Sequence, residues 1–399
     1  MLTSGNSGKA AVVACLALFV SGWGCSAARS SAVAPPTTAP APALAASAEQ
    51  LGTLQRLADS LRTVRRWPGL SLAVTLADGR VAAVTSGYSD TTRKIALDTS
   101  HLLMQGSVGK TYVAAVAMQL VAEGKLEIDA PIARYLPNAK WLDRIATART
   151  ITVRQIMNHT SGIVRYEFKK EVTDRLTAEP YKVWTPEERL EPLFDDAPPF
   201  KPGEGWEYSD TNYIILGMII ERITGNSYYA ELQRRILQPL DLRKTLPTDS
   251  PEIPGLANGY AGPRNELGGY DASLRADGSF AMNPQFEWTG GGIASTTSDL
   301  ARWARMLYEG NAFPAALVPR MLESVQSKLG PNAKYGLGVI VRPTPMGTTW
   351  GHSGFFPGYA TEMMYFPDLK MSAAVQVNTS APYPGGLPAV LQAAVRALR

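Results

Sequence analysis

The residues best suited to chemistry in this 399-residue chain are a serine and a lysine three positions apart. Ser107 and Lys110 open the segment Ser107–Glu123, whose Ala, Val and Leu content predicts a helix that ends at Gly124. Residues three apart lie on one helix face, so the two side chains can touch. In the first turn, free backbone amides and the helix dipole favour negative charge on the serine oxygen.

The pair indicates nucleophilic catalysis, because a lysine whose pKa is lowered by burial can act as the base for a serine hydroxyl. Taken alone, the spacing fits a capping serine and a solvated lysine better, since four-residue motifs with two free positions recur by chance. Two more segments favour catalysis. Tyr208–Asp210 (YSD) follows the Pro202-Gly203 turn and precedes a helical segment, which places a tyrosine at a loop tip. Trp350–Gly354 (WGHSG) is typical of a strand end, where Gly354 lets another backbone or a ligand approach closely.

Together these motifs resemble the catalytic set of the serine β-lactamase and penicillin-binding protein superfamily. The branch they are most similar to contains class C β-lactamases, DD-peptidases and related esterases. The three motifs are Ser107-x-x-Lys110, Tyr208-x-Asp210 and His352-Ser353-Gly354. Ancillary segments with the same likeness are 120–136 (LVAEGKLEIDAPIARYL), 156–163 (IMNHTSGI) and 290–303 (GGGIASTTSDLARW). The resemblance covers essentially the whole chain after the expected leader.

The resemblance implies a role for each residue of the first two motifs. Ser107 would be the acylated nucleophile, and Lys110 would take its proton or hold the charge of the site. Tyr208 would pass a proton to the leaving group. Asp210 would orient Lys110 or the substrate amide.

The third motif would form the opposite wall of the site. There, His352 would help to polarise Tyr208 or bind substrate, with Ser353 and Gly354 beside it. The backbone N–H groups of Ser107 and Phe355 would form the oxyanion hole, where removing one donor typically lowers the rate about 100- to 1000-fold. The implied mechanism needs no metal and no organic cofactor.

Two departures from the family pattern bear on the substrate. The second motif usually ends in Asn, whereas an ionised Asp210 favours the ammonium of Lys110 and weakens that lysine as a base. The base role then shifts toward Tyr208, whose pKa a nearby cation would lower. Efficient β-lactamases begin the third motif with Lys, and His352 is a weaker, pH-dependent cation for a β-lactam carboxylate. We therefore expect acyl transfer on a D-Ala-type cell-wall peptide or an ester, with slow or no β-lactam hydrolysis.

Other functions are alternatives to this one. A class C β-lactamase is an alternative within the family, and a non-catalytic sensor that binds cell-wall peptides or β-lactams is the alternative from another class. Gly109-Lys110-Thr111 resembles the end of a P-loop, but Met104 stands where that motif requires glycine. The chain has no Gly-x-Ser-x-Gly, which excludes a nucleophile elbow. For His159 we expect a structural hydrogen-bonding role at a helix end.

The elements that must position these residues follow from hydrophobic periodicity and turn signals. The expected helices are 51–67, a short helix capped at 152–155, pieces within 176–249, a helix over 300–307 capped by Ser298 and Asp299, and 386–399. The expected strands are a hairpin over 70–87 that turns at Asp78-Gly79, then 335–341, 348–351, 358–366 and 371–377. This order predicts an α+β fold: an antiparallel β-sheet flanked by N- and C-terminal helices, with an inserted mostly helical lobe and the active cleft between them.

Composition excludes several kinds of partner. The net charge is 39 − 35 = +4, and the basic residues are scattered, so a nucleic-acid partner is not expected. With only three His, a multi-histidine zinc site is nearly excluded. The two cysteines, Cys15 and Cys25, precede the folded region, which therefore has no disulfide framework and no thiol nucleophile.

The first 25 residues have the features of an export signal. Lys9 precedes the apolar run Ala10–Val20, which is too short for a bilayer of roughly 30 Å and is typical of a signal h-region. Cys25 resembles the lipid-bearing cysteine of a bacterial lipoprotein, although Gly22 stands where leucine is usual. Lipidation at Cys25 and ordinary signal cleavage both fit.

We therefore expect an exported protein of the periplasm or cell envelope in three segments. These are a signal over 1–25, a Pro/Ala-rich linker over 26–50 and a β-lactamase-like serine hydrolase domain over 51–399. We expect a monomer acting on a small-molecule, ester or peptide substrate, with a membrane attachment if Cys25 is lipidated.

Overall fold

The structure is a computed structural model that describes residues 45–263, 271–381 and 386–399. The expected signal, Cys25 and most of the expected linker lie outside the described residues. All described residues belong to one unit, Pro36–Arg399. In the described ranges, no helix has both the length and the apolar character that a membrane crossing requires.

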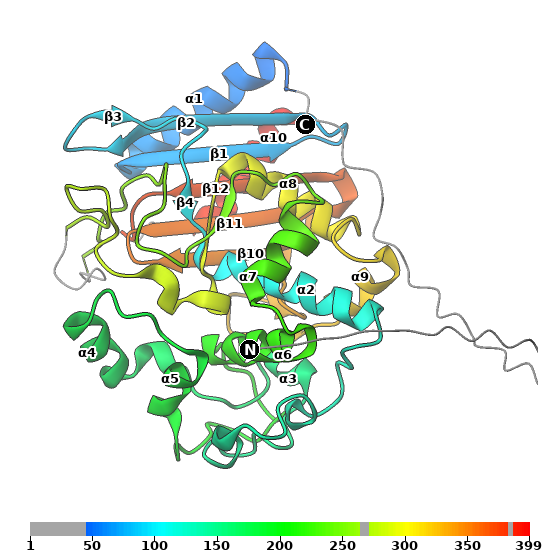
Figure 1. The fold of residues 1–399 in the computed structure, drawn as a ribbon. Helices are drawn as coiled ribbons and strands as arrows, with labels where there is room; N and C mark the ends of the chain where they lie inside the picture. Colours follow the sequence, from blue (N-terminus) through cyan, green and yellow to red (C-terminus); the bar gives the residue numbers. More distant parts are fainter. Residues whose placement is uncertain (1–44, 264–270, 382–385) are drawn as a thin grey trace, which may run out of the picture. The chain divides into compact units, whose positions relative to one another are not determined.

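An antiparallel sheet with the strand order β3-β2-β1-β12-β11-β10-β9-β8-β7 forms the centre of this unit (Figure 1). Strand β1 (Gly69–Thr75) comes from the beginning of the described chain and β12 (Met371–Val377) from its end. The two strands pair with each other, with Val74 opposite Ala373. The predicted sheet, completed by both ends of the chain, is therefore confirmed.

The remaining strands extend the sheet to either side of this central pair. The predicted hairpin is present as β1 and β2 (Val81–Asp90), with the short β3 (Ile95–Ala96) at the edge. On the other side the strands are β11 (Tyr359–Phe366), β10 (Gly347–Phe356), β9 (Ile340–Thr344), β8 (Lys334–Tyr335) and β7 (Val325–Gln326).

Two of the expected strands have different bounds. The single strand expected over 335–341 is wrong, because the chain breaks between β8 and β9 at Gly338, whose φ of +79° is incompatible with a strand. The strand expected over 348–351 is longer, because β10 continues through Gly354 to Phe356.

The two terminal helices cover one face of the sheet. α1 (Ala48–Arg65) and α10 (Gly386–Leu398) bury Leu54 and Leu391 against Leu72 and Val375 of the central strands. α1 begins inside the range expected for the linker, because Ser47 caps the helix in a capping box with Gln50.

The opposite face is covered by α8 (Thr297–Tyr308) and α2 (Lys110–Ala122). The cap expected at Ser298 and Asp299 is wrong, because the side chain of Thr296 accepts the N–H of Asp299. The carboxylate of Asp299 accepts the N–H of Lys244 instead, and so ties α8 to a neighbouring loop.

The mostly helical insertion is confirmed. Figure 1 shows its helices gathered on the side of α2 that faces away from the sheet. They are α3 (Val153–Met157), α4 (Lys170–Ala178), α5 (Pro186–Leu190) and α6 (Asp210–Thr224), with α7 (Tyr228–Leu232) and α9 (Val318–Leu322) nearer the sheet. The capping box expected at Thr152 opens α3.

A second, three-stranded sheet links the large sheet to the start of α2. Its order is β4 (Leu103–Met104), β6 (Ile293–Ser295) and β5 (Thr245–Pro247). β4 leads directly to Ser107, and the residues before β6 include Gly290. Pairing of β4 with β6 therefore brings the Gly290 carbonyl next to the start of α2.

Candidate active site

The first two expected catalytic residues meet at the start of α2. A 3-10 turn, Gly106–Gly109, precedes α2. Ser107 therefore lies in this tight turn, and Lys110 is the first residue of the α-helix. The Lys110 Nζ donates to the Ser107 Oγ at 3.1 Å. Lys110 is completely buried and Ser107 is half-buried. The contact that the spacing predicts is present.

Lys110 is a fully engaged ammonium. Its Nζ also contacts the Asp210 Oδ1 at 2.5 Å and donates to the carbonyl of Gly290. The Ser107 Oγ and the Gly290 carbonyl accept two of the three N–H groups of the ammonium, and the carboxylate of Asp210 is its ion-pair partner. Burial lowers the pKa of Lys110 and is the largest single effect, but the charge of Asp210, together with smaller contributions from Tyr208 and Glu287, outweighs burial and raises that pKa above its ordinary value. Lys110 at rest is a charged donor, as the acidic Asp210 predicted.

Asp210 is the counterion of Lys110 and the first residue of α6. Burial raises its pKa, but Lys110 and then Arg165 oppose burial, and the net result is a pKa below the usual value. The helix N-terminus also favours a negative charge at this position. Asp210 is therefore a carboxylate at neutral pH.

Tyr208 lies beside the pair with a free hydroxyl. The Lys110 Nζ is 5.0 Å from the centre of the Tyr208 ring. The phenolic oxygen is buried, and no hydrogen-bond partner for it exists among the residues that the structure describes. Burial raises the pKa of Tyr208 to about 12, although Lys110 opposes that rise. The expected net lowering is therefore wrong, because the cation has a smaller effect than burial, and Tyr208 is a neutral phenol.

The imidazole ring of His159 packs against the ring of Tyr208 and supports its position. Its ring lies 4.2 Å from the Tyr208 ring, centre to centre, and its Nδ1 accepts the backbone N–H of Ser209 at 3.2 Å. Burial, and then the Lys110 charge, lowers the pKa of His159 well below its ordinary value, so the imidazole is neutral. This structural role is the one that the sequence suggested.

His352, on β10, is buried and engaged at both ring nitrogens. Its Nε2 lies 2.7 Å from the hydroxyl of Tyr335, and its Nδ1 lies 2.6 Å from the carbonyl of Ser353. Burial, and then Lys110, lowers the pKa of His352 to about 3. His352 is therefore neutral at physiological pH, whereas the sequence predicts a pH-dependent cation at this position. The ring is 6.2 Å from that of Tyr208 and contacts Tyr335 instead.

The expected oxyanion-hole segments are held together by glycine contacts. A Cβ at Gly354 would lie 1.9 Å from the carbonyl oxygen of Gln105, and one at Gly106 would lie 2.3 Å from that of Phe355. Only glycines allow this approach, which the sequence predicted at Gly354. The backbone of Phe355 is thereby brought beside the turn that carries Ser107.

Sequence reasoning missed three titratable side chains around Lys110 and Asp210, which are Arg165, Glu167 and Glu287. The Arg165 Nε donates to the Glu167 Oε1 at 2.6 Å. Burial, and then Asp210, raises the pKa values of Glu167 and Glu287 to about 8 each. A signal existed for all three, because they flank the ancillary segments 156–163 and 290–303.

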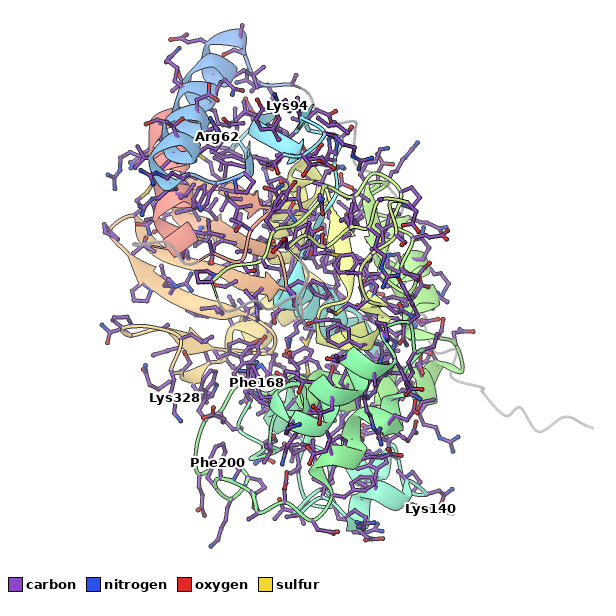
Figure 2. All side chains as sticks on the ribbon, turned by 90° about the vertical axis from the view of Figure 1, so that its left-hand side faces the viewer. Arg62, Lys94, Lys140, Phe168, Phe200 and Lys328 are labelled. Carbon is purple, nitrogen blue, oxygen red and sulfur yellow. The ribbon has the colours of Figure 1, made fainter. Side chains whose placement is uncertain are left out.

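Arg165 also connects the site to its rim. Its guanidinium carbon lies 5.3 Å from the centre of the Tyr208 ring and 4.2 Å from that of Phe168. Phe168, which is labelled in Figure 2, is 72% exposed. Arg165 therefore lies between a half-buried aromatic ring of the site and an aromatic ring in solvent.

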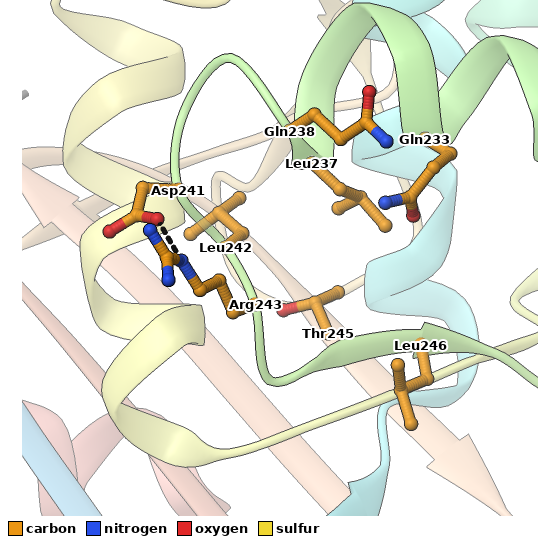
Figure 3. Close-up of a pocket in the computed structure, with 8 residues that line it drawn as sticks. All are labelled: Gln233, Leu237, Gln238, Asp241, Leu242, Arg243, Thr245 and Leu246. Carbon is orange, nitrogen blue, oxygen red and sulfur yellow. Dashed lines mark hydrogen bonds and ion pairs between the residues drawn. The ribbon is translucent and has the colours of Figure 1, made fainter. Parts of the chain in front are cut away.

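A cavity of about 280 Å³ lies elsewhere in the molecule (Figure 3). It is lined by Gln233, Leu237, Gln238, Asp241, Leu242, Arg243, Thr245 and Leu246. None of these is an expected site residue, so the chemistry at Ser107, rather than cavity size, locates the site. In the described part of the chain, no cluster of three or more His, Cys, Asp or Glu is arranged to hold a metal ion.

Comparison with known proteins relates the chain to one family. A family model described as beta-lactamase matches residues 54–396. Penicillin-binding protein 4 of Amycolatopsis lactamdurans is 28% identical over 295 residues, which cover 74% of this chain and 72% of that protein. Esterase EstB of Burkholderia gladioli is 26% identical over 311 residues, which cover 71% of this chain and 78% of the esterase.

A solved structure shows the same likeness in three dimensions. The D-stereospecific amidohydrolase from a Streptomyces species superposes with a TM-score of 0.73 at 28% sequence identity. The match covers 86% of this chain and 97% of that protein. Both the fold and the sequence matches agree with the resemblance that the three motifs indicate.

Proposed function

The chain belongs to the beta-lactamase family and is a hydrolase of that family, and on this premise we propose that it forms an acyl-enzyme on Ser107. We propose peptides of the D-Ala cell-wall type, or esters, as its substrates, with slow or no turnover of β-lactams. The observation that carries this proposal is the contact set of Lys110 with Ser107 and Asp210 beside the unpartnered phenol of Tyr208.

The protonation states at rest favour a proton relay through the phenol. As the Ser107 Oγ bonds to the substrate carbonyl carbon, its proton passes to the Tyr208 Oη. The proton of the phenol passes to the leaving nitrogen or oxygen, whose bond to the carbonyl carbon breaks. The ammonium of Lys110 stabilises the negative charge that develops on the Oγ. This route needs neither a free amine nor a phenolate.

Deacylation follows the same route in reverse. Water attacks the acyl carbon and gives a proton to the Tyr208 Oη, while the phenol returns its proton to the Ser107 Oγ. The acid product leaves, and both hydroxyl groups are restored. The Tyr208 hydroxyl supports this two-way role, because it makes no hydrogen bond with the residues that the structure describes.

The charges near the third motif favour a substrate whose binding does not depend on a carboxylate group. His352 is neutral at physiological pH, since its pKa is lowered to about 3 by burial and then Lys110. The nearby guanidinium of Arg342 is paired with Glu362 at 2.8 Å. The carboxylate of a β-lactam, and equally that of a terminal D-Ala, would therefore meet no unpaired cation from these residues, which favours the ester among the proposed substrates.

A substrate panel on the purified protein tests the proposal. We expect turnover of D-Ala-D-Ala peptides or short p-nitrophenyl esters, little turnover of nitrocefin, and none of any substrate by Ser107→Ala. Efficient nitrocefin hydrolysis would favour the class C β-lactamase alternative. Stoichiometric labelling of Ser107 by a fluorophosphonate without turnover of any substrate would favour the sensor alternative.

We also propose export to the cell envelope, based on the apolar run at residues 10–20 and on Cys25. Cell fractionation tests the export. Incorporation of labelled palmitate, compared between the natural chain and Cys25→Ala, distinguishes a lipid anchor from ordinary signal cleavage.

A further inference from the structure

Arg189 is a completely buried cation that makes no ion pair with any acid the structure describes. It lies in α5, and the neighbouring acid Glu188 pairs with Lys182 at 2.8 Å instead. Burial lowers the pKa of Arg189, but a guanidinium keeps its proton in proteins. Because burying a charge is costly unless hydrogen bonds compensate, the acceptors around this guanidinium must supply the compensation.

All three nitrogens of the guanidinium donate to main-chain carbonyls. The Nε donates to Phe286 at 2.7 Å, the Nη1 to Trp184 at 3.0 Å and the Nη2 to Gln285 at 2.8 Å. The guanidinium carbon also lies 5.7 Å from the centre of the Trp288 ring. Arg189 therefore joins the loop before α5 to the segment that contains Gln285 and Phe286.

This segment depends on side chains for its hydrogen bonds, because it consists of two short 3-10 turns, Pro284–Phe286 and Trp288–Gly290. The Tyr166 hydroxyl donates to the Phe286 carbonyl at 3.0 Å, so that oxygen has two side-chain donors. A buried carbonyl that loses its donor is costly, so the segment should shift when Arg189 is replaced.

The second turn ends at the catalytic pair. The Gly290 carbonyl, four positions after that of Phe286, accepts the ammonium of Lys110. The next residue packs directly on the turn that carries the nucleophile, since a Cβ on Gly109 would lie 2.8 Å from the Cα of Gly291. A shift of the segment therefore changes the surroundings of Lys110.

We propose that Arg189 is a positioning residue, which holds the carbonyls of Gln285 and Phe286 and thereby fixes the Gly290 carbonyl that accepts the ammonium of Lys110. With that acceptor displaced, the ammonium can turn away from the Ser107 Oγ, where it stabilises the negative charge that develops during acylation. The inference rests on the proposed function, because it concerns the rate at which Ser107 is acylated.

The geometry of the guanidinium explains why the position holds an arginine. An apolar side chain could fill the same volume without the cost of burying a charge, but it would leave three carbonyls without this donor. A lysine keeps the charge, but all its donors are on one nitrogen, whereas the planar guanidinium reaches acceptors in three directions. Replacement of Arg189 by Met and by Lys therefore separates volume, charge and geometry.

The kinetics of fluorophosphonate labelling of Ser107, measured on the full chain below the melting temperature of each variant, test the proposal. For Arg189→Met we expect the maximal labelling rate to fall on the order of 30- to 100-fold, with the apparent affinity for the probe within about twofold of the natural value. For Arg189→Lys we expect a fall of about 3- to 10-fold. Ser107→Ala gives the background.

Added guanidinium ions provide a second readout, which a role in filling space would not move. Arg189→Ala leaves room beside the three carbonyls for a free guanidinium ion. We expect guanidinium chloride, at concentrations too low to unfold the protein, to raise the labelling rate of Arg189→Ala by about fivefold or more. Sodium chloride at the same ionic strength should not.

Arg302→Met is the matched control. Arg302, on α8, is mostly buried, donates to the carbonyls of Asp241 at 3.0 Å and Leu240 at 3.3 Å, and pairs with Asp299. Its replacement should lower the melting temperature but leave the labelling rate of the folded protein unchanged.

Tyr166→Phe is a milder change on the same segment, because it removes one of the two side-chain donors to the Phe286 carbonyl. We expect labelling to slow by about two- to fivefold. The effects of Tyr166→Phe and Arg189→Lys should not add in the double variant, since both act on one carbonyl. These two variants decide the matter if Arg189→Met does not fold.

The proposal is overturned if the folded Arg189 variants label at the natural rate, or if Arg302→Met slows labelling as much as Arg189→Met does. A loss of probe affinity at an unchanged maximal rate would overturn it too. So would failure of guanidinium to rescue Arg189→Ala, or equal rescue by sodium chloride. A natural chain that the probe does not label, or labelling of Ser107→Ala at the natural rate, would instead refute the proposed function.

Discussion

At the scale of single residues, the site depends on which groups carry protons at rest. Lys110 donates to Ser107 and to the carbonyl of Gly290 and forms an ion pair with Asp210, while Tyr208 is a neutral phenol whose hydroxyl has no partner among the described residues. Burial acts on both side chains, but Lys110 has the counterion Asp210 while the Tyr208 hydroxyl has no partner among the described residues. The pair is therefore arranged to move a proton through Tyr208 while Lys110 keeps its charge.

Tyr208→Phe removes only the phenolic hydroxyl that would carry the proton relay. We predict that acylation of Ser107 slows by on the order of 100- to 10,000-fold, because the leaving group loses its proton donor. The stability should change little, since the deleted hydroxyl makes no hydrogen bond with the described residues. Stopped-flow ester hydrolysis and a thermal melt measure the two effects. A rate within threefold of the natural chain would contradict the relay.

Asp210→Asn changes the charge of the site without changing its size. Without the carboxylate, burial dominates and the pKa of Lys110 falls, because the charge that raises it is gone. We predict a new dependence of acylation on pH, with the rate rising as Lys110 loses its proton. Fluorophosphonate labelling from pH 6 to 10 follows this limb. An unchanged profile would show that Asp210 does not control the charge of Lys110.

At the scale of elements, the active site depends on a backbone contact between β10 and the turn before α2. We predict that Gly354→Ala destabilises the protein by about 2 to 4 kcal/mol and abolishes turnover, because its Cβ would overlap the carbonyl of Gln105. Gly52→Ala on α1 is the matched control, since its Cβ meets only the end of Arg56 at 3.5 Å. That change should stabilise the helix by about 0.5 to 1 kcal/mol. Chemical denaturation compares the two, and equal effects would contradict this explanation.

Local signals predicted the elements that depend on neighbouring residues. The hairpin turn at Asp78-Gly79, the capping box at Thr152 and the Ser107–Lys110 contact each involve a few adjacent positions. The split between β8 and β9 was missed, because the expected strand ran through Gly338.

Glu167 and Glu287 were missed for a different reason. They come near Asp210, which the second motif predicted, only after the insertion has folded, although both flank ancillary segments. The balance between burial and charge at Tyr208 also depends on the assembled environment. Sequence motifs therefore predicted which residues take part, but not their resting protonation states.

At the scale of the whole molecule, two half-buried acids, Glu167 and Glu287, give the free energy of unfolding a defined dependence on pH. Burial, and then Asp210, raises the pKa values of Glu167 and Glu287 from 4.5 to about 8, so the folded protein binds more protons than the unfolded chain between these values. Stability from these two groups therefore falls as the pH rises from 4.5 to about 8. Asp98 and Glu188 contribute stability that is lost as the pH falls toward 2, because hydrogen bonds and ion pairs lower their pKa values to about 2.

We predict a maximum of thermal stability in the mildly acidic range and a falling melting temperature between pH 5 and 8. The double variant Glu167→Gln with Glu287→Gln should flatten this slope, since neither amide titrates. Glu127→Gln, a change at an exposed acid, should keep it. Differential scanning fluorimetry across pH measures all three, and a slope that survives in the double variant would assign it to other groups.

The central pairing of β1 with β12 also fixes when the protein can first become native during synthesis. β12 lies between β1 and β11, yet it is the last strand of the described chain to leave the ribosome. Until then β1 and β11 each have an open edge, and such edges favour aggregation or capture by chaperones. A product shortened before residue 371 would keep both edges open, so proteolytic quality control should remove it even though every catalytic motif is already present.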